Sequence, residues 1–389
     1  MAQAPTQQKS PQEINAIMRR LLVDSAPKYI KKLGTVTAVA GGDARIKLAN
    51  VGIITRLICQ VTCNLTIGTA TATIGPKGAH AAITKVKLTD FDGSDRISCS
   101  GYQLFIRNSL RNHQSALQGM AALQSAVIGT SATTAGLPTT GLTNPNIPTA
   151  VATANMVFFI EVPVAIDSDA NDLRGAILAQ TTVGELYLVL SFASAFYGNG
   201  DDDKVYNGAA TTTVAINSIS IDTFQEYYLP QALSNGVVPI PQLDILTVYE
   251  LNGALRSTDN LVSGSEKLLS LPNVRQIIGV YSNYLNNAIM GGGSGNDLAI
   301  IKLIANGNNI IREYSANFLY YEQRRRLGTD IGKGAYFIDM KENPIQTNLY
   351  GNVQLSLTPG GVLTSPSVEV MYEGLYIKGA ALSGLSQSG

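Results

Sequence analysis

The stretch Phe318–Leu357, FLYYEQRRRLGTDIGKGAYFIDMKENPIQTNLYGNVQLSL, decides the fold. Its first part, Phe318 to Arg326, is rich in aromatic and basic residues and is typical of a helix. A short apolar strand, Ala335 to Ile338, is expected next. A loop that begins at Pro344 leads into residues 349–357, where apolar and polar residues alternate, and this period of two predicts a half-buried strand.

Short words from this stretch recur earlier in the chain and indicate an internal duplication. The paired words are Gln180-Thr181 and Gln346-Thr347, Ile166-Asp167 and Ile338-Asp339, and Asn50-Val51 and Asn273-Val274. The spacing between the words differs in the two halves, so the loops differ in length. We interpret the chain as two diverged copies of one β-rich unit.

The composition limits the classes of function. The chain has 389 residues, which is enough for two domains of ordinary size. Its formal net charge is zero and 14% of its residues are charged, which argues against a coat that presents a basic face to nucleic acid. A surface poor in charge and rich in Gly, Ala and Thr suits a protein that buries its sides against copies of itself, although many secreted β-sandwiches share this composition.

The cysteines and the N-terminus bear on the cellular compartment. Cys59 and Cys63 are expected on one face of a strand, and Cys99 stands alone. This odd count without a Cys-x-x-Cys spacing argues against a disulfide framework or a zinc site, so we expect small buried residues. The first residues have no apolar core like that of a signal peptide, and no apolar run reaches the ~18 residues that span a bilayer. We expect a product made and kept in a cytosol until assembly.

A helix is predicted to begin at Ser10. Ser10 suits the N-cap, Pro11 suits the first helical position, and Glu13 completes a capping box. Pro27 is expected to end this helix. Apolar residues at helical spacing form a stripe on one face: Ile14, Ile17, Met18, Leu21 and Leu22. Basic residues flank or follow the stripe: Arg19, Arg20, Lys28, Lys31 and Lys32.

Two interpretations of this segment remain open. The stripe packs on a neighbouring subunit, or the helix lies on an anionic membrane surface, where each basic residue contributes roughly 1 kcal/mol. The two are compatible. The candidate membrane-facing residues are Ile14, Ile17, Met18, Arg19, Arg20, Leu21, Lys28, Lys31 and Lys32.

Strands are expected through most of the remaining chain. Residues 53–67 read as one long strand, and residues 97–106 as another. Helices are expected at residues 108–127 and 243–255. The low-complexity stretches 128–154 and 286–296 are candidates for loops on the outer or intersubunit surface.

No pattern of catalytic or metal-ligating residues stands out. The two histidines, His80 and His113, have no metal-ligand spacing, and neither a nucleophile elbow nor a phosphate-binding loop occurs. The acidic loop Asp90–Asp95 is predicted to be a hairpin turn rather than a calcium loop. Three acidic residues, Asp201, Asp202 and Asp203, either hold a divalent ion at a subunit contact or form a solvated cluster. We assign no catalytic residue, cofactor site or metal site.

The arginines Arg324, Arg325 and Arg326 are candidates for contacts between subunits. Cations at a helix C-terminus are favoured by the helix dipole, and such a run also contacts neighbouring molecules. An anion site is the alternative.

Six separated segments resemble the major capsid protein of tectiviruses, tailless double-stranded DNA phages with an internal membrane. They follow in the same order and cover most of the chain. The segments are Ala49–Ile53, Leu88–Phe91, Ser100–Phe105, Val162–Ala165 with Leu173–Ala179, Ile240–Asp244 and Arg324–Leu357. Residues 110–155 and 284–312 match poorly.

The resemblance implies an all-β fold of two eight-stranded jelly rolls in tandem, with short helices in the loops and an N-terminal helix. It implies no enzyme and no cofactor, but a homotrimeric capsomer of pseudo-hexagonal outline that tiles an icosahedral shell. That shell surrounds an internal membrane that encloses double-stranded DNA. The implied partners are other copies of the chain, the viral membrane through the N-terminal helix, and minor capsid and vertex proteins, without direct contact to nucleic acid. The protein would be made in the host cytoplasm and reside in the virion.

The chain is expected to divide into an arm at residues 1–33, a first jelly roll at 34–228, a linker at 229–242 and a second jelly roll at 243–389. A tandem β-sandwich that binds carbohydrate or acts as an adhesin is the alternative function. An enzyme on a jelly-roll scaffold is the third. The three hypotheses predict different observations. A capsid protein should form a compact trimer, and a carbohydrate-binding protein should be retained on glycans. An enzyme should lose turnover after acid-to-amide changes.

Overall fold

Strands follow one another in two blocks along the chain. The computed structural model describes residues 9–75, 77–111, 147–167, 172–180, 184–201, 203–206, 212–257, 261–273, 275–286, 289–290, 297–327 and 334–377. The first block contains β1 (Lys28–Ala38), β2 (Asp43–Lys47), β3 (Ile53–Gly68), β4 (Ile83–Thr89), β5 (Asp95–Cys99), β6 (Thr153–Pro163), β7 (Ile177–Leu178), β8 (Tyr187–Phe192) and β9 (Thr213–Tyr228).

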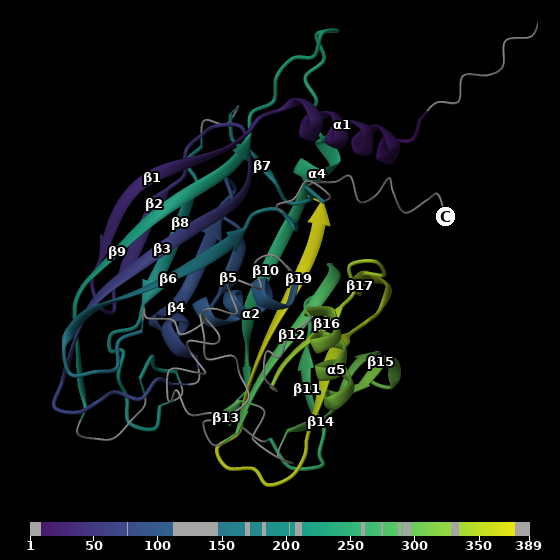
Figure 1. Cartoon of the computed structure of the whole chain (residues 1–389). Helices are drawn as coiled ribbons and strands as arrows, with labels where there is room; N and C mark the ends of the chain where they lie inside the picture. The colour runs from purple at the N-terminus through teal and green to yellow at the C-terminus, as the bar shows by residue number, and fades with distance from the viewer. Residues whose placement is uncertain are drawn as a thin grey trace, which may run out of the picture.

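The second block lies beside the first (Figure 1). It contains β10 (Thr247–Ser257), β11 (Lys267–Ser270), β12 (Gln276–Asn286), β13 (Ile289–Met290), β14 (Leu298–Ala305), β15 (Asn309–Ser315), β16 (Ala335–Asp339), β17 (Ile345–Gln346), β18 (Val353–Pro359) and β19 (Ser367–Ile377). The helical segments are α1 (Pro11–Ser25), η1 (Gly78–Ala82), α2 (Gly101–Arg111), α4 (Gln242–Leu246), α5 (Ala316–Leu327) and η2 (Thr347–Leu349).

Each block closes into a two-layered roll, and one sheet runs through both. In the first roll, the sheet β1-β9-β3-β6 packs on β5-β4-β8-β2. In the second, β13-β12-β19-β10 packs on β11-β18-β14-β15. The rolls join where β5 and β10 pair in parallel, with Ile97 opposite Leu251. The fold is therefore all-β with two jelly rolls in tandem, as predicted.

Strand β3 shows why the alternating pattern was informative. Its residues alternate between buried and half-buried along almost the whole length, as the period of two requires. Leu57, Cys59, Val61 and Cys63 point into the first core and are fully buried. All three cysteines are buried free thiols, as expected from the sequence.

Strands at the junction between the rolls do not alternate, because both of their faces are covered. Almost every residue of β12 and most of β19 are buried. In β12, Ile277 and Val280 belong to the core of the second roll, whereas Ile278 and Tyr281 belong to the core that extends from the first. Strands buried on both faces read as continuous apolar runs.

The prediction of a strand at residues 97–106 was wrong beyond Cys99. Strand β5 ends there, and the buried helix α2 begins at Gly101. Ser100 caps this helix: its hydroxyl oxygen accepts from the Gln103 backbone N–H at 3.1 Å, and the Gln103 side-chain oxygen accepts from the Ser100 backbone N–H at 3.0 Å. Of the helix predicted at residues 108–127, the part up to Arg111 lies in α2 and the rest lies outside the described residues.

The prediction of a helix at residues 243–255 was also largely wrong. Helix α4 ends at Leu246 and strand β10 begins at Thr247, whose hydroxyl donates to the Leu243 carbonyl oxygen at 2.7 Å. Helix α1, helix α5 and strand β16 lie where the sequence placed them, and the capping box of α1 is formed. Strand β1 begins at Lys28, inside the segment predicted as an arm.

The imidazole of His80 is buried in the core of the first roll, and its burial affects how stability depends on pH. It stacks on Phe105 of α2 with ring centroids 4.2 Å apart, and Nε2 lies 3.3 Å from the Phe159 carbonyl oxygen. Nδ1 is buried and has no hydrogen-bond partner among the described residues. Burial lowers the pKa of His80 from 6.5 to about 4. Between pH 6.5 and pH 4, His80 binds a proton in the unfolded chain but not in the folded chain. The unfolding free energy therefore falls as the pH falls.

We therefore expect the unfolding free energy to drop between pH 6.5 and pH 4 by up to about 3 kcal/mol from His80. His80→Gln, which keeps a hydrogen-bond donor but does not titrate, should flatten this part of the profile. Urea denaturation at stepped pH measures it, with His113→Gln as the control. A His80→Gln profile parallel to that of the wild type would contradict the assignment.

Candidate assembly surfaces

A buried ion cluster joins the two rolls. Arg107 and Arg111 lie one turn apart on α2 of the first roll, and both bind Glu373 on β19 of the second. Arg107 Nε donates to Glu373 Oε1 at 2.8 Å, and Arg111 Nε donates to Oε2 at 2.7 Å. The Tyr249 hydroxyl also donates to Oε1, at 2.6 Å.

The charges of this cluster are fully withdrawn from water. The side chains of Arg107 and Glu373 are 0% exposed. Burial alone would raise the pKa of Glu373, but the charges of Arg111 and Arg107, with the hydrogen bonds from Arg111 and Tyr249, lower it from 4.5 to about 2. The carboxylate is therefore ionised at neutral pH.

The other nitrogens of both guanidinium groups also have hydrogen-bond partners, among them the Asn108 side-chain oxygen for Arg107. Arg107 donates to the Ile166 carbonyl oxygen at 3.0 Å, and Arg111 donates to that of Ile278 at 3.1 Å and to Asp339 Oδ1 at 3.0 Å. Gly279 on β12 makes room for the cluster, because a Cβ there would lie 2.6 Å from Glu373 Oε2 and 2.7 Å from Arg111. The cluster thus fixes α2 against the sheet of the second roll.

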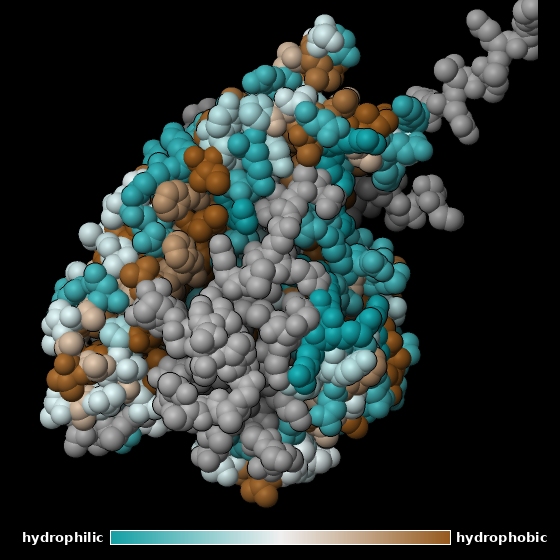
Figure 2. All heavy atoms as spheres, in the orientation of Figure 1, coloured by the Kyte–Doolittle hydropathy of each residue, from teal (hydrophilic) through white to brown (hydrophobic). Residues whose placement is uncertain are grey.

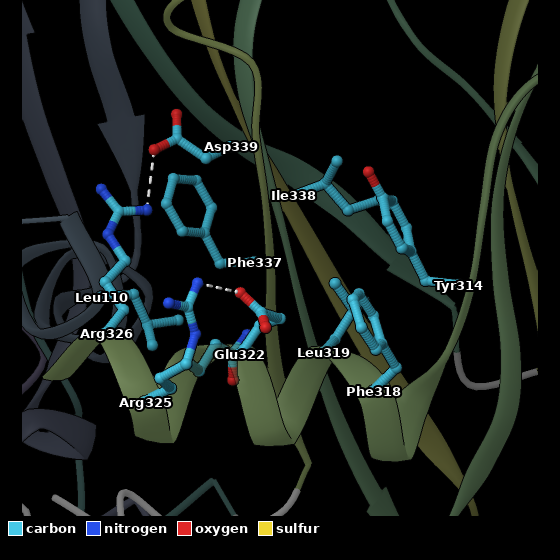
Figure 3. Close-up of a pocket in the computed structure, with 11 residues that line it drawn as sticks. Leu110, Tyr314, Phe318, Leu319, Glu322, Arg325, Arg326, Phe337, Ile338 and Asp339 are labelled. Carbon is cyan, nitrogen blue, oxygen red and sulfur yellow. Dashed lines mark hydrogen bonds and ion pairs between the residues drawn. The ribbon is translucent and has the colours of Figure 1, made fainter. Parts of the chain in front are cut away.

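A groove of about 500 Å³ opens beside α5, next to this junction (Figure 3). Arg326 Nη1 donates to Asp339 Oδ2 at 2.7 Å, so Asp339 links Arg326 to the buried Arg111. Arg325 turns to Glu322 at 2.7 Å, as Figure 3 also shows. The groove is lined by Leu110, Tyr314, Phe318, Leu319, Glu322, Gln323, Arg325, Arg326, Phe337, Ile338 and Asp339.

The three predicted contact arginines therefore have different surroundings. Arg324 is exposed, and the side chain of Arg325 is 65% exposed and pairs with Glu322 of the same helix. Arg326 is bound to the junction through Asp339. Two exposed aromatic residues, Phe318 and Tyr321, stand on the same helix.

Helix α1 is attached to α4 by polar groups. Arg19 Nε donates to Asp244 Oδ2 at 2.6 Å, and Asn15 Nδ2 donates to Oδ1 at 2.9 Å. The Asn15 side-chain oxygen accepts from the Leu243 backbone N–H at 2.9 Å. Leu22 is fully buried below this contact in a small apolar cluster.

The predicted apolar stripe of α1 is consequently divided. Leu22 packs inward and Met18 and Leu21 are half-buried, whereas Ile14 is 46% and Ile17 is 37% exposed. Figure 2 shows hydrophobic atoms on the outer side of α1, at the top of the view. Helix α1 is thus attached to the rolls through the polar side chains of Asn15 and Arg19, and its isoleucines face outward.

The basic residues near α1 are partly paired. Arg20 lies 3.6 Å from Asp24 on the helix surface. On β1, Lys28 binds Glu226 at 2.9 Å and Lys32 binds Asp222 at 3.0 Å. Lys31 is exposed.

The acidic loops are bound to basic or polar neighbours. Asp90 accepts from Arg96 at 2.9 Å in the β4–β5 turn, and Asp203 accepts from Lys77 at 2.6 Å. Asp202 lies outside the described residues. In the part of the chain that the structure describes, no group of three or more His, Cys, Asp or Glu side chains is arranged to hold a metal ion. No described helix has the length and apolar character needed to cross a membrane.

Two jelly rolls joined in one chain define the class of double jelly-roll viral capsid proteins. A chain in the atomic structure of Sulfolobus Turreted Icosahedral Virus is 14% identical, with a TM-score of 0.62 over 92% of this chain and 93% of that chain. A chain of the PBCV-1 virus capsid is 12% identical, with a TM-score of 0.56 over 90% and 94%. These likenesses concern the fold.

The chain belongs to the P3 major capsid protein family. The family model of the P3 N-terminal domain matches residues 4–231, and that of the C-terminal domain matches residues 246–386. Major capsid protein P3 of Enterobacteria phage PRD1, a tectivirus, is 25% identical over 334 residues, which are 84% of this chain and 81% of that protein. The resemblance to tectivirus capsid proteins is thus confirmed, and the chain is a structural component of a virion.

Glu373→Gln tests the junction. The variant keeps the shape but removes the carboxylate that Arg107 and Arg111 share, although Arg111 retains its pair with Asp339, so we expect a loss of roughly 3–5 kcal/mol near neutral pH. In the wild type, the contribution of Glu373 is present above pH 4.5 and is lost as the pH falls toward about 2, so the two proteins should converge there. Chemical denaturation at stepped pH measures this difference.

Glu322→Gln is the matched control, because Glu322 forms its ion pair with Arg325 on the surface. It should change the unfolding free energy by less than about 1 kcal/mol. Equal effects of the two variants would contradict a structural role for the buried cluster.

Proposed function

We propose that this major capsid protein assembles as a homotrimer whose outline is nearly hexagonal, and that such capsomers tile an icosahedral shell. The observation that carries the proposal is the rigid junction: Arg107 and Arg111 fix one roll to the other through Glu373. Two similar rolls in each of three chains give six similar sides. A threefold object with six sides fills a hexagonal lattice with few kinds of contact.

The surface of α5 is the proposed contact between copies. Phe318 lines the groove, Tyr321 and Arg324 are exposed elsewhere on the same helix, and aromatic residues and arginine are enriched in protein interfaces. The Arg326–Asp339 pair holds this surface against the inter-roll junction, so a neighbour bound here would meet a preformed shape.

The outer side of α1 is the proposed contact with the viral membrane. Ile14 and Ile17 face away from the rolls, and the exposed cations Arg20 and Lys31 lie on the same terminal segment. Apolar side chains enter the acyl boundary, while each cation near anionic headgroups contributes roughly 1 kcal/mol. Asp244 holds the helix by its opposite side, which leaves the isoleucines available.

The zero net charge supports a shell that does not touch DNA directly. Double-stranded DNA would lie inside the membrane, and minor capsid and vertex proteins would complete the shell. An arm at residues 1–33, two rolls at 34–228 and 243–389 and a linker at 229–242 are the proposed functional parts.

Light scattering on the purified full chain tests the trimer. We expect a mass three times the 41.2 kDa of the chain. Arg324→Glu should weaken the trimer or its further assembly, because it reverses a charge on the proposed contact. Lys85→Glu, an equal change at an exposed position on β4, should not. A monomeric wild type would contradict the trimer, and an unchanged Arg324→Glu variant would contradict the α5 contact.

Liposome sedimentation tests the membrane contact. The double variant Ile14→Ser, Ile17→Ser should bind vesicles of phosphatidylserine and phosphatidylcholine at least about tenfold more weakly, because two apolar side chains no longer enter the lipid. Added salt should also weaken wild-type binding. Val39→Ser with Val362→Ser removes two exposed valines elsewhere and serves as the control. Equal binding by both double variants would end this proposal while leaving the trimer untouched.

A further inference from the structure

A lysine lies between two carboxylates where the loops of the first roll meet the second. Lys77, just before η1, places Nζ 2.6 Å from Asp203 Oδ1 and 2.6 Å from Glu369 Oε1 on β19. The side chains of Lys77 and Glu369 are only 7% and 10% exposed, and that of Asp203 is 34% exposed. An amine and two carboxyl groups are thus in contact in a site largely closed to water.

Two further features distinguish the site from a simple ion pair. Glu369 Oε2 is buried and has no hydrogen-bond partner in the described part of the chain, so this carboxyl group keeps one acceptor oxygen that no described donor occupies. The ring of the fully buried Tyr102 lies 5.8 Å from Lys77 Nζ and keeps the amine in apolar surroundings. Glu369 therefore lies within hydrogen-bond distance of the amine and has a second oxygen without a described donor.

We propose that Lys77 and Asp203 form an intramolecular amide bond, and that Glu369 moves the protons for this reaction. The atoms meet without any rearrangement of the chain, because the reacting nitrogen already touches the carboxyl group it would attack. Such a fixed arrangement replaces a bimolecular encounter and lowers the barrier.

The reaction balances without any added reagent. Burial disfavours the ammonium form of Lys77, but the charges of Glu369 and Asp203 raise its pKa overall, so the starting state is an ammonium between two carboxylates. One proton passes from Nζ to Glu369, and the neutral amine attacks Asp203 Cγ. Glu369 gives its proton to an Asp203 carboxyl oxygen and takes a second one from nitrogen. The oxygen leaves as water after this second proton is delivered to it, and the amide carries no charge.

The bond would cross-link residues 126 positions apart. It would join the turn before η1 to the loop that precedes β9, next to the seam with β19. A covalent link of this kind restricts the unfolded chain much as a disulfide does, and it needs no oxidising compartment. It would therefore suit a shell protein whose cysteines are all buried free thiols.

Intact mass spectrometry on the full chain tests the proposal directly. Folded wild-type protein is held at neutral pH, denatured and weighed. We expect a mass lower than that of the sequence by one water molecule, failure of trypsin to cleave at Lys77, and a branched peptide that joins Lys77 to Asp203. The full sequence mass with normal cleavage would overturn the proposal, as would a branch at Glu369.

Three variants define the roles. Lys77→Arg keeps the positive charge but removes the reactive amine, and should show the full mass. Glu369→Gln keeps both reacting groups but removes the proton carrier, and should show the full mass or a much slower loss of water. Lys204→Arg changes the nearby pair with Asp201, which is more exposed and 3.9 Å apart, and should still lose one water. Loss of water by Lys77→Arg would overturn the assignment of the amine.

Discussion

The position of one jelly roll on the other depends on the two arginines that grip Glu373. All three charges are buried, and each donor or acceptor around them is directed at a particular partner. A buried ion pair of this kind is weak evidence for stability, because apolar residues of the same volume often serve as well. The ion pair differs from apolar contacts because its hydrogen bonds require particular positions of donor and acceptor. If one roll slid along the other, a buried charge would lose its partner.

This constraint explains the form of the strands around it. Since α2 inserts its arginines against β19 and β12, both faces of these strands are covered and the chain has no edge to expose there. The parallel pairing of β5 with β10 continues the sheet across the seam. Gly279 belongs to the same arrangement, because its missing side chain is what allows Arg111 to reach Glu373. A capsomer built from such chains can rely on the shape of a two-roll unit.

The sequence predicted those elements whose stabilising contacts are local. Strand β3 alternates along its length, and α1 carries its capping box within four residues, so both were found. The capping box of α2 at Ser100 and Gln103 was present too, but its apolar residues were assigned to a strand. Strand β10 was taken for a helix, and because Thr247 to Leu251 are all buried, this part of the strand has no period of two that would indicate it.

The candidate sites were predictable only in part, because their contacts join distant residues. Glu373 is 262 positions from Arg111, and Asp244 is 225 positions from Arg19. Sequence alone therefore placed Arg19 beside an outward stripe, whereas it faces inward to Asp244. It did identify Arg324, Arg325 and Arg326 as one group, but not that Arg326 is tied to the junction by Asp339.

Three of the long-range ion clusters in the described part of the chain lie at boundaries between parts of the fold. Glu373 lies between the rolls, Asp244 lies between α1 and α4, and Glu369 lies between the first-roll loops and β19. The interiors of the rolls are instead apolar and tolerate small shifts, because apolar contacts have little directional preference. Charged groups at the boundaries do not tolerate such shifts. The chain thus separates two tasks: apolar burial makes each roll stable, and buried charge determines where each part sits on the next.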